Sequence, residues 1–343
     1  MTGPNPDTVQ IIVSLTSHPP RFPYLVKQLD QLRKQTEFPD LLVLNIAHSD
    51  ESALPAEIEN LKFPFLFEIN ICEDLGPGTK LIPTLLKYPL CTIITLDDDI
   101  EYPENLFENL FSESRENPGD IVAARAHRPK FSMGFPIPYL DWDWEVNQDF
   151  SHILMPTGAG GTLYPPLSLH PEVTNVEAYK ALSYSTDDLW FWVHSLRKGT
   201  RVRMTKIAFP LQERDEGQSS GLSRSGNVEI INDLNLRSLW NTYNIQLSLT
   251  LFAQKSGIAP MQSSGHHPRA DAIREEIGIK YMDEFLDLLL SLEPRKRLVL
   301  TKIILQKGIE LKVMKENQDK LKVTVMLVLR NVLRKMKKLD IKG

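Results

Sequence analysis

The chain has 343 residues, of which 42% are hydrophobic and 24% are charged, and its formal net charge is −5 at pH 7. This length fits one large α/β domain with an appendage or two small domains, and the hydrophobic content excludes a wholly disordered chain. The net charge gives no general attraction to nucleic acid, so we expect no nucleic-acid partner.

Strand-like apolar runs alternate with helical segments in the first part of the chain. The expected strands are residues 11–15, 41–47, 65–71 and 91–96. Residues 24–35 have apolar side chains at helical spacing, and residues 79–87 are expected to form a short helix. This alternation predicts an α/β fold with a mostly parallel central sheet flanked by helices. Ligands of such sheets bind at the carboxyl ends of the strands, where residues 16–21, 72–80 and 97–99 lie.

The middle of the chain, residues 125–166, is rich in Pro, Gly, Trp and Tyr and has little helical periodicity. Long irregular segments inside compact domains are typically functional, and the aromatic content argues against disorder. Trp142 and Trp144 offer indole faces on which a ligand with an apolar face, such as a sugar ring, would stack, although tryptophans that anchor the core are an equal alternative. Residues 176–198 are expected to be helical, and residues 212–227 to form a mobile loop.

No targeting or membrane-spanning segment is expected. Residues 1–10 are polar and lack the features of a signal peptide, and no apolar stretch reaches the roughly 18–20 residues that span a bilayer. Cys72 and Cys91 lie in or beside strand-like runs, as buried thiols of a reducing compartment do. We expect a cytoplasmic protein, either free or peripherally bound at the inner face of the cell membrane.

The last part of the chain, residues 286–343, is predicted to be a helical tail that follows a main domain of residues 1–285. Residues 293–343 contain fifteen Lys or Arg and five Asp or Glu. Within residues 321–339, apolar side chains recur at helical spacing beside basic ones. A basic amphipathic helix binds membrane surfaces or packs its apolar stripe on another protein surface, and both interpretations stay open.

Three aspartates, Asp97, Asp98 and Asp99, directly follow an apolar strand. Adjacent carboxylates repel each other unless a cation is present, and hard divalent cations combine carboxylates with substrate phosphates. Because residues two apart on an extended chain point the same way, we expect Asp97 and Asp99 to face one side and Asp98 the other. The pattern predicts a metal and diphosphate site, with a solvated acidic turn or a helix N-cap before Pro103 as the alternatives.

Four blocks of the chain resemble GT-A-fold glycosyltransferases, including the family 2-like nucleotide-sugar transferases. The blocks are residues 14–17 (SLTS) with Arg21, residues 74–80 (DLGPGTK), residues 96–99 (LDDD) with Tyr102 and Pro103, and residues 157–165 (TGAGGTLYP) with residues 186–190 (TDDLW). Each block is weak alone, but their order and spacing over residues 10–240 are specific. The resemblance implies a GT-A, Rossmann-like catalytic domain over residues 1–285.

The resemblance also implies roles for individual residues. Asp188 or Asp187 would be the catalytic base, with Asp188 preferred, and this Asp-Asp stands where such enzymes carry Glu-Asp. A divalent metal, Mn²⁺ or Mg²⁺, would be bound by Asp99 and Asp97, and His266 would complete the site unless it is simply solvated. The implied donor-binding residues are Thr16, Arg21, Asp74, Lys80, Asp97, Asp98, Gly160 and Gly161.

The expected reaction moves a sugar from a nucleotide-diphosphate sugar, such as a UDP-sugar, to a hydroxyl of a glycan or lipid-linked glycan. The metal would stabilise the leaving diphosphate, and a carboxylate would take the acceptor proton, with inversion expected. Bacterial surface-polysaccharide or lipopolysaccharide synthesis is the expected setting. One alternative is a sugar nucleotidyltransferase, which typically has a glycine-rich basic loop where this chain has residues 14–21 (SLTSHPPR). The other is a non-catalytic carbohydrate-binding protein, which would not need both carboxylate clusters.

Overall fold

The computed structural model describes residues 10–132, 135–147, 149–206, 212–213 and 228–245. The chain divides into two units, residues 1–267 and 268–343, and all of the described residues belong to the first. The predicted boundary at residue 285, the basic tail, His266 and most of the predicted loop at 212–227 lie outside the described residues. They stay predictions.

A mixed α/β fold surrounds one eight-stranded sheet. Its strands in chain order are β1 (Ile11–Thr16), β2 (Leu41–Ala47), β3 (Leu66–Cys72), β4 (Thr92–Thr95), β6 (Ile121–Ala123), β10 (Phe150–Ser151), β12 (Thr162–Tyr164) and β13 (Val202–Met204). Their spatial order is β10-β13-β6-β12-β4-β1-β2-β3. The neighbours β4, β1, β2 and β3 are parallel, as are β6 and β13, whereas β12 and β10 run antiparallel to their neighbours. The predicted, mostly parallel sheet is confirmed and is consistent with a Rossmann-like GT-A fold.

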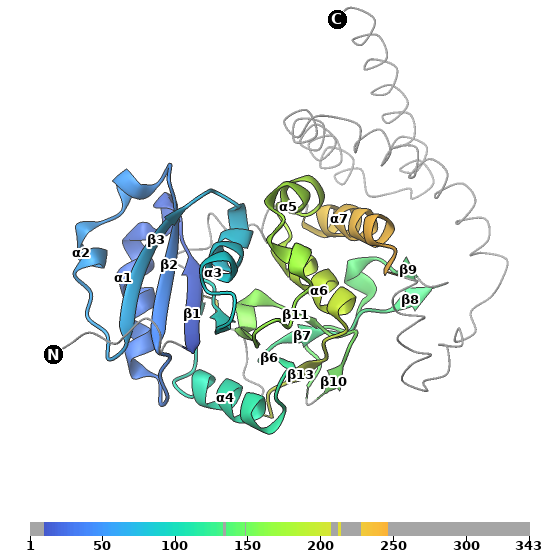
Figure 1. The fold of residues 1–343 in the computed structure, drawn as a ribbon, viewed down its shortest axis with the longest axis horizontal. Helices are drawn as coiled ribbons and strands as arrows, with labels where there is room; N and C mark the ends of the chain where they lie inside the picture. Colours follow the sequence, from blue (N-terminus) through green and yellow to red (C-terminus); the bar gives the residue numbers. More distant parts are fainter. Residues whose placement is uncertain (1–9, 133–134, 148, 207–211, 214–227, 246–343) are drawn as a thin grey trace, which may run out of the picture. The chain divides into compact units, whose positions relative to one another are not determined.

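Alternate side chains of the strands enter two hydrophobic cores, one on each face of the sheet. On one face, Val13 and Leu15 pack with α1 (Phe22–Asp30), α2 (Ala56–Glu59) and α4 (Leu106–Glu116). On the other face, Ile12 packs with α3 (Ile82–Lys87), α5 (Val176–Leu182), α6 (Asp187–Lys198) and α7 (Val228–Tyr243). Figure 1 shows helices on both sides of the sheet. Because both faces are covered, β1 and β2 are largely apolar in sequence, with Ser14 and Asn45 as buried polar exceptions.

The expected helices are interrupted at places that the site uses. Residues 24–35 become α1 followed by a 3-10 helix, Gln31–Lys34, and residues 79–87 become a 3-10 helix, Gly76–Lys80, followed by α3. Residues 176–198, expected to be helical, form two helices, α5 and α6, separated by residues 183–186. The Ser183 hydroxyl donates to the Thr186 carbonyl at 2.9 Å, and local bonds of this kind compete with helix continuation.

The middle segment is built from short strands and turns. β7 (Ala126–His127) pairs with β11 (Met155–Pro156), and β8 (Phe131–Ser132) pairs with β9 (Phe135–Pro136). Near the aspartate triplet, β5 (Ile100–Glu101) pairs with β14 (Gln212–Glu213). The segment is therefore irregular, as expected, but it also supplies β10 and β12 to the main sheet.

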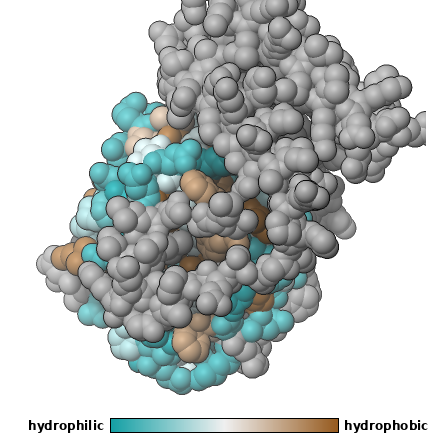
Figure 2. Space-filling view, turned by 90° about the vertical axis from the view of Figure 1, so that its right-hand side faces the viewer, coloured by the Kyte–Doolittle hydropathy of each residue, from teal (hydrophilic) through white to brown (hydrophobic). Residues whose placement is uncertain are grey.

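The surface that Figure 2 shows is largely hydrophilic over the described residues, with smaller hydrophobic patches between them. Among the described residues, no helix combines the length and the hydrophobicity that crossing a bilayer requires.

Candidate functional site

One pocket of about 830 Å³ lies at the carboxyl ends of the parallel strands. Thr16 ends β1 and Ala47 ends β2, and both line the pocket together with residues that follow β3 and β4. The opposite wall comes from the middle segment and from residues 184–189, at the start of α6. The pocket thus occupies the edge of the sheet where ligands of α/β proteins bind.

The aspartate triplet turns out of the sheet after β4 ends at Thr95. Arg21 pairs with both Asp98 and Asp99, and its Nη2 lies 2.8 Å from Asp99 Oδ2. Asp97 instead pairs with Lys80. The expected alternation is therefore wrong, because residues 98 and 99 form a turn and Asp98 shares Arg21 with Asp99. All three aspartates line the pocket.

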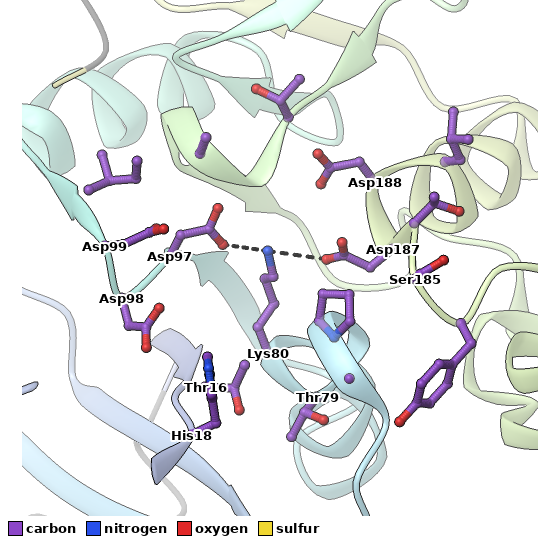
Figure 3. A pocket seen from close by; sticks show the side chains of 18 of the residues that line it. Thr16, His18, Thr79, Lys80, Asp97, Asp98, Asp99, Ser185, Asp187 and Asp188 are labelled. Carbon is purple, nitrogen blue, oxygen red and sulfur yellow. Dashed lines mark hydrogen bonds and ion pairs between the residues drawn. The ribbon is translucent and has the colours of Figure 1, made fainter. Parts of the chain in front are cut away.

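Lys80 links the triplet to the second acidic group. Its ammonium pairs with Asp97 and lies 3.2 Å from Oδ2 of Asp187, as Figure 3 shows. The backbone of Lys80 is anchored to β1, because the Ser14 hydroxyl donates to its carbonyl at 2.6 Å. Burial lowers the pKa of Lys80, but the charges of Asp187 and Asp97 outweigh it and raise the pKa well above its ordinary value. Lys80 is therefore a permanent cation between two carboxylates.

Asp188 lies beside this cluster at the first turn of α6 (Figure 3). The backbone N–H of Gly158 donates to Asp188 Oδ1 at 3.0 Å. A Cβ at Gly158 would lie 2.7 Å from Lys80 Nζ and 3.3 Å from Oδ1 of both Asp97 and Asp188. Only glycine fits here without displacing one of these groups, so the two acidic clusters meet over its backbone.

Two carboxyl groups of the pocket have raised pKa values. Burial, followed by the charge of Asp187, raises the pKa of Asp188 to about 7. Burial, followed by the charge of Asp97, raises the pKa of Asp99 to about 6. A carboxyl group with a pKa near the operating pH suits proton transfer, and such shifts cluster at functional sites.

The resemblance implies a divalent metal at Asp97 and Asp99. Their hard carboxylate oxygens suit Mg²⁺ or Mn²⁺, and Lys80 and Arg21 contact one oxygen of each. In the part of the chain that the structure describes, no group of three or more His, Cys, Asp or Glu side chains is arranged to hold a metal. Two carboxylates alone make an incomplete site, so a metal bound here would need further oxygens from a phosphate-bearing ligand, as Mg²⁺ sites commonly have.

Most of the residues predicted for the site are brought together. Those that line the pocket are Thr16, Arg21, Asp74, Lys80, Asp97, Asp98, Asp99, Trp144, Asp187 and Asp188. Trp142 is not among them, because it is 4% exposed and its Nε1–H donates to the Ile137 carbonyl at 2.9 Å. Trp142 thus anchors the core, whereas Trp144 is 46% exposed.

Gly160 and Gly161 do not line the pocket either. A Cβ at Gly160 would lie 2.3 Å from the Cβ of Arg125, and Gly161 has a φ of +85°. Packing and backbone conformation explain these two glycines, and Gly158 is the glycine of this loop that approaches the charged groups.

The further pocket residues that received no role from the sequence include the aromatic side chains of His127, Tyr139 and Tyr184. His127 reaches the pocket because β7 pairs with β11, and this pairing has no signature in residue spacing. Tyr184 lies in the break between α5 and α6. The aromatic richness of residues 125–166 was the one signal that pointed to this wall.

No protein-family model and no curated protein matches the chain. Among solved structures, it is similar to residues 1–349 of S. aureus TarS in complex with UDP, at 14% identity and a TM-score of 0.38, over 59% of this chain. The match spans only 58% of that TarS chain. It is also similar to CMP:2-keto-3-deoxy-manno-octonic acid synthetase complexed with CTP, at 11% identity and a TM-score of 0.35, over 60% of this chain and 92% of that one. Similarity at this level assigns no activity, so function rests on the geometry of the pocket.

Proposed function

We propose that the protein is a glycosyltransferase that moves a sugar from a nucleotide-diphosphate sugar, such as a UDP-sugar, to a hydroxyl of a glycan or lipid-linked glycan. The observation that carries the proposal is the meeting of two acidic groups in one pocket. Asp97 and Asp99 follow β4, and Asp188, with a pKa of about 7, lies across Gly158 from Asp97. A metal-assisted departure and a base-assisted attack need two such groups.

On the donor side, the diphosphate would lie against Arg21 and Lys80, with a divalent metal on Asp97 and Asp99. When bound, the metal supplies Lewis-acid stabilisation of the leaving diphosphate. Arg21 and Lys80 orient the carboxylates through their ion pairs and add fixed positive charge beside the leaving group. The nucleoside would lie toward Thr16 and Asp74, which line the same pocket.

On the acceptor side, Asp188 would act as the base. Gly158 N–H holds Oδ1, so Oδ2 is the oxygen that would take the proton of the acceptor hydroxyl. As that proton leaves, the hydroxyl oxygen forms a bond to the anomeric carbon of the donor, and the bond from this carbon to the diphosphate oxygen breaks. A single displacement of this kind inverts the anomeric configuration.

Product analysis separates this proposal from its alternatives. We expect a UDP-sugar and a glycan acceptor to give UDP and an elongated glycan. A sugar nucleotidyltransferase would instead convert a nucleoside triphosphate and a sugar phosphate into a nucleotide sugar and pyrophosphate. A carbohydrate-binding protein would release neither product. One mixture contains a UDP-sugar and a glycan, and the other contains a nucleoside triphosphate and a sugar phosphate. Chromatography of the products distinguishes the three functions, and release of pyrophosphate without any UDP would contradict the proposal.

The setting of the reaction is also part of the proposal. A lipid-linked acceptor would give the basic tail of residues 286–343 a purpose, because cationic segments bind anionic lipid surfaces. Bacterial surface-polysaccharide or lipopolysaccharide synthesis is the proposed context, supported by the sequence resemblance.

A further inference from the structure

Three aromatic side chains of the middle segment, His127, Tyr139 and Trp144, line one wall of the pocket. The ring centroid of His127 lies 4.6 Å from that of Trp144 and 6.0 Å from that of Tyr139. The Tyr139 and Trp144 rings lie 5.4 Å apart. His127 is 1% exposed and Trp144 is 46% exposed, so a buried ring supports an accessible indole. An accessible, rigid aromatic face is a surface on which the apolar face of a sugar ring packs.

His127 adds a hydrogen-bond donor whose position can be assigned. The backbone N–H of Glu145 donates to Nδ1 of His127 at 3.1 Å, so in the neutral ring the proton is on Nε2. Burial, followed by the charge of Arg125, lowers the pKa of His127 to about 3, which keeps the ring neutral. Within the described residues, the buried Nε2 has no hydrogen-bond partner. Buried donors are normally satisfied, so this one calls for an acceptor atom from a ligand or a water.

The charged groups near His127, Tyr139 and Trp144 indicate which class of ligand this aromatic cluster would bind. Tyr139 and the proposed base Asp188 line the same pocket, and burial followed by the charge of Asp188 raises the pKa of Tyr139. The carboxylates of Asp97, Asp187 and Asp188 line the same pocket and would repel an acidic sugar.

Arg125 also lines the pocket, but Glu145 pairs with its guanidinium at 3.1 Å. A neutral ring with hydroxyl groups therefore fits this wall better than an anionic one.

We propose that His127, Tyr139 and Trp144 form a subsite for a neutral sugar ring, in which Trp144 stacks on the ring and His127 Nε2–H donates to one of its oxygen atoms. The identification of that ring with the acceptor rests on the proposed function. The subsite itself is a claim about binding and can be tested without turnover.

The experiment titrates the whole chain with a panel of methyl glycosides and measures binding by saturation-transfer NMR and tryptophan fluorescence. The neutral probes are methyl glucoside, galactoside, mannoside and N-acetylglucosaminide, and methyl glucuronide is the acidic comparison. We expect at least one neutral glycoside to bind, and to bind more tightly than the glucuronide. Trp144→Ala should weaken this binding about tenfold. Phe150→Ala is the matched control, because Phe150 is an aromatic side chain that is 54% exposed and does not line the pocket.

Two substitutions of His127 isolate the Nε2 donor. His127→Gln places an amide donor near the former Nε2, whereas His127→Asn places its amide near the former Nδ1 and leaves the Nε2 position empty. Both variants lose the aromatic ring equally, so their difference reports the hydrogen bond. We expect His127→Asn to bind the glycoside about three- to tenfold more weakly than His127→Gln does. If neither His127 variant folds, Trp144→Ala decides alone, since that side chain is exposed.

The proposal is overturned if no neutral glycoside binds, if the glucuronide binds best, or if Trp144→Ala binds like the unsubstituted chain. Equal binding by folded His127→Asn and His127→Gln variants overturns the role of Nε2. Release of UDP from UDP-sugars is measured in parallel to separate this result from the proposed function. If glycosides bind but no UDP is released, the subsite is supported and the proposed glycosyltransferase activity is contradicted. If UDP is released but the substitutions do not change glycoside binding, the activity is supported and the subsite is contradicted.

Discussion

Asp187 and Asp188 are adjacent in sequence but meet different surroundings. Asp187 is 7% exposed, and its Oδ2 lies 3.2 Å from the Lys80 ammonium. Asp188 is half-buried, accepts one hydrogen bond from Gly158 and has a pKa of about 7. Burial raises the pKa of Asp187 as well, but the Lys80 ammonium opposes this rise and lies against Oδ2, so these surroundings favour Asp188 as the base.

Activity should depend on pH through the protonation of Asp188. A base must be deprotonated to act, so activity is present above its pKa and is lost as pH falls through it. With a pKa of about 7 for Asp188, kcat/KM should be level above neutrality and fall about tenfold per pH unit below pH 7. Initial rates over a pH series at low donor concentration measure this. A profile that stays flat down to pH 5 would show that Asp188 does not limit the reaction.

A second prediction concerns Asp187. Asp187→Asn removes one of the two carboxylates that contact the buried Lys80 ammonium, and it should lower the free energy of unfolding by roughly 1–3 kcal/mol. Urea denaturation measures the change. Glu37→Gln is the matched control, because the exposed pair of Glu37 with Arg115 should contribute about 0–1 kcal/mol. A stable Asp187→Asn variant that has lost kcat would instead identify Asp187 as the base.

The residues of the site were predictable to different degrees. Asp97, Asp98 and Asp99 stand out because acidic residues directly follow an apolar strand. The link through Lys80 was not predictable, because Asp97 and Asp187 are distant in sequence and meet Lys80 only after folding. The ion pairs of Arg21 with Asp98 and Asp99 were not predictable either, because they form only through the turn that follows Asp97.

At the scale of elements, the loop that contains Gly158 brings the two acidic clusters together. Gly158→Ala should lower kcat/KM about 10- to 100-fold, because a Cβ 2.7 Å from Lys80 Nζ must displace the charged groups. The fold should survive, since the nearest atom is the end of a flexible side chain. Gly160→Ala is the contrasting variant, because its Cβ would lie 2.7 Å from the backbone N of Arg125 and should lower stability. Thermal melting and steady-state rates compare the two, and an unchanged kcat/KM in Gly158→Ala would contradict this account.

The strands and helices differ in how well their bounds could be predicted from the sequence. β2 was predicted at its observed bounds, and β1 within one residue, because both are apolar runs buried on both faces. The end of α5 was not predicted, because residues 183–186 (SYST) contain no Gly or Pro to mark a break, and the hydroxyl of Ser183 bonds locally there. That break places Asp187 and Asp188 at the N-terminus of a helix. The short strands of the middle segment were missed because two-residue pairings carry no periodicity.

At the scale of the whole molecule, ligand and metal should stabilise the folded chain together. A ligand that binds only the folded state raises Tm by mass action, so UDP with Mn²⁺ or Mg²⁺ should raise Tm, and EDTA should reduce the shift. Asp99→Ala should reduce it as well, because Asp99 is a proposed metal ligand. Glu59→Ala, an exposed change in α2, should leave the shift unchanged. An undiminished shift in EDTA and in Asp99→Ala would exclude the metal from donor binding.

The role of Asp188 as the base of a sugar transfer is tested most directly by the turnover of a UDP-sugar and a glycan acceptor, compared between the unsubstituted chain and Asp188→Asn. UDP release and the anomeric configuration of the product are followed by NMR. We predict an inverted product, and a kcat that falls by about 10²–10⁴ in Asp188→Asn while the affinity for UDP stays unchanged. A retained configuration, or a kcat that Asp188→Asn does not lower, would contradict the account.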